Sequence, residues 1–88
     1  MANLGYKKNV NTKGEYQKVS DILNIEFVVD KKYQIQILNY ATVIISATKP
    51  TEGGIEIISP VPFGYTHKDG TDLYIKSSEI GTTINVSE

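Results

Sequence analysis

The sequence predicts an all-β fold: a small antiparallel β-sandwich or barrel of six to seven short strands with a flexible N-terminal arm. Apolar and polar residues alternate along several short segments, as they do in half-buried strands. Turn-forming residues separate these segments about every ten residues, a spacing typical of sandwiches and barrels. The 88 residues suffice for one domain, which we expect at residues 15–88 after an arm at residues 1–14.

The predicted arm is mostly polar and rich in asparagine, lysine and glycine. After Met1, only Leu4, Tyr6 and Val10 offer large apolar side chains for burial. Such a segment gains little from burial, so we expect it to order only against a neighbour.

The domain is predicted to begin with short elements. Residues 15–19 alternate and indicate a strand. Ser20 and Asp21 precede Ile22, which is typical of a helix N-cap with a single helical turn, or of a loop with its own side-chain hydrogen bonds. Apolar residues alternate with a mixed set over residues 25–30, where we predict another strand.

Residues 33–47 form the most apolar stretch of the chain. Residues 33–38 alternate between an apolar and an uncharged polar face, and residues 42–47 are rich in β-branched side chains, so both segments predict strands. Asn39 and Tyr40 interrupt the run. The pair therefore indicates either a hairpin or one strand broken by a bulge.

Prolines and glycines punctuate the following segments. A turn is predicted over residues 49–54 and a strand over residues 55–58. Residues 59–64 contain two prolines, which lack the donor that a central strand needs, so this segment should run along a sheet edge. Asp69 and Gly70 are typical of a hairpin turn within residues 66–72.

The last predicted elements are a strand at residues 73–76, a connection at residues 77–81 and a final strand at residues 82–86. In the final strand, Ile84 and Val86 share one face, and polar residues occupy the other.

Composition excludes several classes of function. The formal net charge is −1, and lysine carries every positive side-chain charge, so the arginine-rich basic footprint of nucleic-acid-binding proteins is missing. Without cysteine the chain has neither disulfides nor thiolate metal sites. A chain of this size buries only roughly 60–65 % of its unfolded surface, so we expect oligomerisation to supply added stability.

The sequence also predicts no association with membranes. No stretch approaches the ~20 apolar residues of a membrane-spanning helix. The N-terminal lysines, Lys7 and Lys8, are not followed by an apolar signal segment. We therefore expect synthesis in the bacterial cytoplasm.

Candidate catalytic and metal-ligating residues are sparse, so we expect neither an enzyme nor a cofactor. His67 is the only histidine, and we interpret it as a solvated turn residue. Asp69 and Asp72 lack the ligand pattern of an EF-hand, and we interpret them as residues that favour a turn. Glu52 and Glu56 flank a glycine turn without a spacing that indicates paired catalytic carboxylates.

Six tyrosines raise the possibility of carbohydrate binding, because exposed aromatic rings stack on sugars. Tyr33, Tyr40 and Tyr74 lie in or beside predicted strands, where rings usually pack inward. Tyr65 is the best candidate for an exposed stacking residue, with Phe63 as its neighbour in a surface patch.

Four phrases resemble small β-rich virion proteins of tailed bacteriophages and prophages: KGEYQKVSDIL (13–23), SATKPTEGG (46–54), PFGYT (62–66) and GTDLYIKSSEIGTTINVSE (70–88). The resemblance implies a non-enzymatic structural role as a head-decoration, head-fibre or tail-associated module within the virion. It implies self-association, with a trimer favoured by analogy, and docking on other virion proteins.

Uncharged residues in and beside the central strands are our candidate interface, because a neighbour can cover them without burying charge: Tyr33, Gln34, Gln36, Tyr40 and Thr42. The alternative is a small carbohydrate-binding β-module that contacts surface glycans through Tyr65, Tyr6 or Tyr16. A third reading is an effector that binds a host protein through an exposed edge strand.

Overall fold

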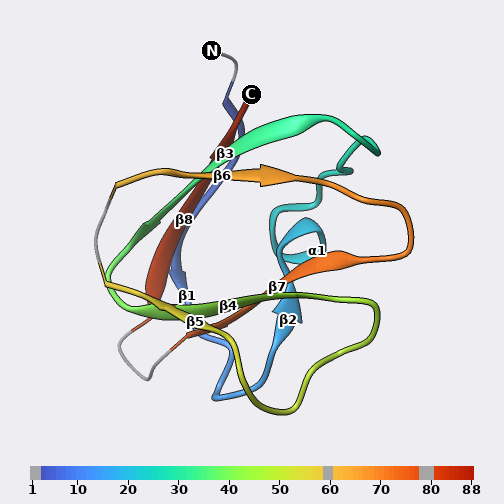
Figure 1. Cartoon of the computed structure of the whole chain (residues 1–88). Coiled ribbons are helices and arrows are strands. Elements are labelled where there is room, and N and C mark those ends of the chain that lie inside the picture. Colours follow the sequence, from blue (N-terminus) through green and yellow to red (C-terminus); the bar gives the residue numbers. More distant parts are fainter. Residues whose placement is uncertain (1–2, 59–60, 78–80) are drawn as a thin grey trace.

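The predicted fold class is confirmed. The computed structural model describes residues 3–58, 61–77 and 81–88, and two four-stranded antiparallel sheets pack face to face in it (Figure 1). The first sheet has the order β1 (Asn3–Val10), β8 (Thr82–Ser87), β3 (Lys32–Leu38), β6 (Phe63–Thr66). The second sheet has the order β2 (Gln17–Lys18), β7 (Asp72–Ser77), β4 (Ala41–Ser46), β5 (Ile55–Ile57).

The core lies between the sheets, where period-two alternation directs the apolar faces of the strands inward. In β3 the residues Tyr33, Ile35 and Ile37 are buried, and in β8 Ile84 and Val86 are buried, as the alternation predicts. The short helix α1 (Val19–Leu23) packs against β7, β1 and β2 (Figure 1). No helix in the described ranges is long and apolar enough to span a membrane.

The segment expected to be an arm contains strand β1, which pairs with β8. The backbone of β1 finds partners in this ladder, so its polar side chains can remain in solvent. Val10, the last residue of β1, and Thr12, which follows the strand, are buried. Residues 3–12 are therefore part of the sandwich, and the start of β1 lies beside the end of β8, where Asn3 pairs with Ser87 (Figure 1).

The short elements after β1 differ from the prediction. Within residues 15–19 only Gln17 and Lys18 are in a strand, because α1 begins at Val19. The predicted helical turn forms as α1, but its N-cap residue is Lys18 and no side-chain hydrogen bond caps it. Ser20 and Asp21, which were predicted as the cap, lie inside the helix.

The strand predicted at residues 25–30 is absent. Ile25 and Phe27 pack against the core, whereas Val28 and Val29 are both exposed, so the alternation matches burial only as far as Phe27. This segment has no ladder partner, and the Val28 N–H donates instead to the Tyr33 hydroxyl at 2.7 Å. The backbone therefore follows the core surface as an irregular connection.

Strands β3 and β4 belong to different sheets, so they form neither the predicted hairpin nor one bulged strand. Asn39 adopts a left-handed conformation (φ 71°), and the chain passes through Asn39 and Tyr40 from the first sheet to the second. Both strands then bury their apolar faces in the same core, with Ile37 and Ala41 fully enclosed.

The turn at Asp69 and Gly70 forms, with Gly70 at φ 82°. It connects β6 to β7, which lie in different sheets, so it is not a hairpin turn. The glycine turn before β5 and the edge position of β6 agree with the sequence analysis. Residues 59–60 of the predicted edge segment and 78–80 of the predicted connection lie outside the described residues.

Candidate functional site

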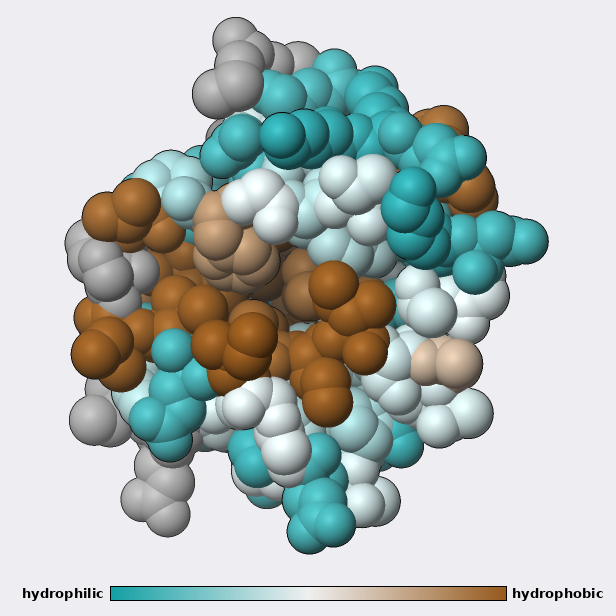
Figure 2. Space-filling view, in the orientation of Figure 1, coloured by the Kyte–Doolittle hydropathy of each residue, from teal (hydrophilic) through white to brown (hydrophobic). Residues whose placement is uncertain are grey.

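The sandwich is open along the side where β5 and β6 end their respective sheets. A groove of about 500 Å³ lies there between the two edges. Strands β4 and β5 supply one wall, and Phe63 and Tyr65 of β6 contribute to the other. Figure 2 shows this hollow within a field of hydrophobic residues.

The strand register shows that residues of the sandwich interior are exposed in this groove. Ile45 lies opposite Leu73, and Ile55 lies opposite Val43. Directly opposed residues of an antiparallel pair point to the same face of the sheet, and both Leu73 and Val43 are buried. Ile45 is nevertheless 56 % exposed and Ile55 70 % exposed, because the opposite sheet does not extend far enough to cover them.

The exposed apolar surface continues beyond the groove. Ile58 follows β5 and is 79 % exposed, and Val61 precedes β6 and is 68 % exposed. We refer to Ile45, Ile55, Ile58 and Val61 together as the apolar patch. Figure 2 shows hydrophobic surface gathered over β4 and β5.

The groove is electrically neutral. In the described part of the chain, no lysine, aspartate or glutamate is among its lining residues. Its one ionisable group is Tyr65, where burial, followed by the charge of Asp72, raises the pKa to about 12. The Tyr65 hydroxyl shares a 2.7 Å hydrogen bond with Nδ1 of His67. A neutral, apolar groove favours an apolar occupant.

Tyr65 is not an exposed aromatic residue. It is 3 % exposed, and its ring makes an edge contact with Phe27 at a centroid distance of 5.1 Å. A ring so enclosed offers no face to a sugar, so the prediction that Tyr65 stacks on a ligand is wrong. Phe63 is partly buried in the groove wall. His67 is half-buried and stacks on Phe27, in contrast to the solvated histidine that we expected.

The five residues predicted as an interface do not share a surface. Tyr33 is buried in the core, so its prediction as an interface residue is wrong. Gln34 and Gln36 alternate with the buried residues of β3 and therefore lie on the outer face of the first sheet. Thr42 lies in the second sheet, between Glu56 and Lys76. Tyr40 is exposed in the connection between the sheets.

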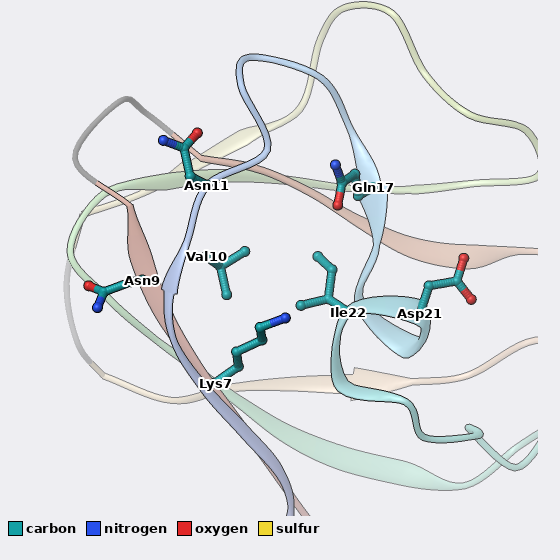
Figure 3. Close-up of a pocket in the computed structure, with 7 residues that line it drawn as sticks. All are labelled: Lys7, Asn9, Val10, Asn11, Gln17, Asp21 and Ile22. Atoms are coloured by element: carbon teal, nitrogen blue, oxygen red, sulfur yellow. The ribbon is translucent and has the colours of Figure 1, made fainter.

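A second cleft, of about 430 Å³, lies between β1, β2 and α1. Figure 3 shows the side chains of Lys7, Val10 and Ile22 pointing into it, whereas those of Asn9 and Asn11 point away. The polar groups thus do not converge on a common point, as they would to orient a polar ligand.

The described residues contain no group of three or more histidine, cysteine, aspartate or glutamate side chains that could hold a metal ion. Asp72 instead forms an ion pair with Lys18 at 3.5 Å. The open side is therefore the main candidate site.

The sequence reasoning missed the apolar patch. A signal was present, because Ile44 and Ile45 are consecutive apolar residues that alternation directs to opposite sides of the predicted strand. Alternation does not reveal which side another sheet covers.

No protein-family model, curated protein sequence or solved structure matches this chain.

Proposed function

We propose that this protein is a non-enzymatic structural protein of a phage or prophage particle that associates with copies of itself and docks on a larger virion assembly. The observation that carries the self-association is the apolar patch beside an open sandwich interior. The virion setting rests on the four sequence phrases that resemble small virion proteins.

The energetics favour coverage of the open side. Water contacts most of the surface of Ile55 and Ile58, and burying such side chains stabilises a complex by roughly 25 cal/mol per Å² of apolar area. Contiguous exposed apolar patches on soluble proteins commonly mark sites of protein association. A structural subunit that is covered in its assembly explains why the chain retains four large aliphatic residues at this position.

The charge of the chain agrees with association between identical copies. With a formal net charge of −1, two copies meet with little electrostatic repulsion. The trimer remains the state favoured by analogy with the virion proteins that the sequence resembles. Within the particle, other virion proteins are the proposed partners for the surfaces that self-association leaves exposed.

The mass in solution tests this proposal. We expect sedimentation across a concentration series to give an oligomer, and Ile55→Glu to weaken association by about tenfold or more, since a charge would enter a desolvated contact. Val28→Glu is the matched control, because Val28 is also an exposed aliphatic residue but lies outside the patch. It should leave the mass unchanged.

A monomer at all concentrations would contradict the proposal. It would shift attention to the glycan-binding alternative, for which Tyr6 on β1 is half exposed. A glycan array with wild type and Tyr6→Ala would then be the next measurement.

A further inference from the structure

The open side presents a hollow and a protrusion next to each other. The hollow is the groove, whose mouth is formed by Ile45 and Ile55. The protrusion is Ile58, the most exposed large hydrophobic residue in the described ranges, which is not among the residues lining its own groove. Both are hydrophobic, and Ile58 directly follows Ile57, which lines the groove. A face with these two features can be complementary to itself.

We infer that the open side binds the same face of a second copy around a two-fold axis, with Ile58 of each copy inserted into the groove of the other. This inference rests on the proposed self-association, and it makes the unit a two-fold dimer in place of the trimer that the resemblance favours. In a two-fold contact, residue i meets residue j and residue j meets residue i, so one protrusion beside one hollow satisfies both partners.

The charge distribution supports a second copy of the chain as the partner that fills the groove. None of the described residues that line the groove is charged, so an isoleucine inserted there removes none of these residues' charges from water. A strongly charged partner would gain nothing from this lining, whereas a second copy brings a matching uncharged face. The formal net charge of −1 opposes the approach of two copies only weakly.

The area required is modest for this molecule. A stable dimer typically buries about 800 Å² on each partner, which is about 15 % of the 5339 Å² accessible surface of this chain. The apolar patch would form the centre of that area. Polar residues that surround the patch would form its rim.

The absence of cysteine allows a direct test of the contact. We would mix Ile58→Cys, carrying an affinity tag that increases its mass, with untagged Ile45→Cys, and treat the mixture with a short bismaleimide. The mixed crosslinked species should exceed that obtained from tagged Lys8→Cys with the same Ile45→Cys. Lys8 is an exposed residue of β1, at the opposite edge of the first sheet, and serves as the matched control.

Three outcomes separate the two proposals. An oligomer by sedimentation together with the specific crosslink between positions 58 and 45 supports the inference. An oligomer, including a trimer, with no crosslink above the Lys8→Cys control overturns the two-fold geometry while the proposed self-association stands. A monomeric wild-type protein overturns both.

Discussion

At the scale of single residues, two buried hydroxyls fasten the N-terminal segment to the second sheet. The Thr12 N–H donates to the Ser77 hydroxyl at 2.8 Å, and the Ser77 N–H donates to the Thr12 hydroxyl at 3.0 Å. Both residues are buried and lie 65 positions apart in the sequence. Each side chain thus supplies the acceptor that the backbone of the other needs away from water.

Replacement of Thr12 by valine should therefore destabilise the fold. Thr12→Val keeps the shape of the side chain but leaves the buried Ser77 N–H without its acceptor, so we expect the free energy of unfolding to fall by about 1–3 kcal/mol. Urea denaturation with an unchanged m-value measures this loss. The exposed Thr48→Val is the control and should change stability by less than about 0.5 kcal/mol. Equal effects would contradict the role of the pair.

Tyr65 makes stability depend on pH at the alkaline end. Its pKa is about 12 in the fold, above the ordinary value of 10.0, because burial disfavours the phenolate. Below pH 10 the side chain is neutral in both states, so this contribution is fully present. Between pH 10 and 12 the unfolded chain releases the proton while the fold retains it, and stability falls as pH rises.

We therefore expect Tyr65→Phe to lose less stability than wild type between pH 10 and 12. The difference should approach about 2–3 kcal/mol, the free energy of a two-unit change in pKa. Chemical denaturation at a series of pH values measures it, with pH 8–9 as the internal reference. A Tyr65→Phe profile parallel to that of wild type up to pH 12 would contradict the assignment.

At the scale of elements, the turn between β4 and β5 positions one wall of the groove. The Tyr16 hydroxyl donates a hydrogen bond to the Gly53 carbonyl, and Lys76 lies over the Tyr16 ring at 5.0 Å from its centroid. Gly54 adopts φ +113°, and a Cβ there would approach the Val43 carbonyl oxygen to 2.9 Å. The turn thus needs glycine for both its conformation and its contacts.

Comparing the stability of Gly54→Ala and Gly70→Ala separates the effect of conformation from the effect of steric contact. Gly70 also has a positive φ, +82°, but a Cβ there meets nothing within 4 Å, so we expect a loss of about 1 kcal/mol from conformation alone. Gly54→Ala adds the steric conflict and should cost at least about 1 kcal/mol more. Thermal and urea unfolding of both variants test this difference. A smaller loss for Gly54→Ala would mean that the close contact is easily relaxed.

At the scale of the whole molecule, the sandwich buries a small core and leaves part of its interior open. Ile45 and Ile55 belong to the inner face by register, yet they contribute little burial to the isolated chain. A second copy would complete their coverage. Stability and association should then be coupled, because binding that favours the folded state raises its apparent stability.

This coupling predicts that the thermal midpoint rises with protein concentration. The midpoint of wild type should increase over a hundredfold concentration series, and Ile55→Glu should need at least about tenfold more protein to reach the same increase, because its association is weaker by that factor. Ile55 is largely exposed, so at low concentration the two proteins should unfold at similar temperatures. A concentration-independent wild-type midpoint would count against an associated folded state.

Alternation and turn chemistry were sufficient to predict much of the architecture. The strands at β3, β4, β7 and β8, the glycine turn before β5 and the inward direction of Ile84 and Val86 follow from neighbouring residues alone. These features are local, since side chains on a strand alternate and glycine permits positive φ wherever the chain needs it.

The sheet to which each strand belongs, and the side left open, depend on residues far apart in the sequence. The chain passes from the first sheet to the second at Asn39. The local sequence pattern was equally compatible with a hairpin at this position. Residues 25–30 alternate like a strand but find no ladder partner. The candidate site was missed for the same reason: Ile45 and Ile55 have the pattern of core residues, and only the limited reach of the opposite sheet exposes them. The sequence by itself determined which residues are apolar and which way they point, whereas tertiary packing decided which of them are covered, because burial requires a partner surface that the local pattern does not specify.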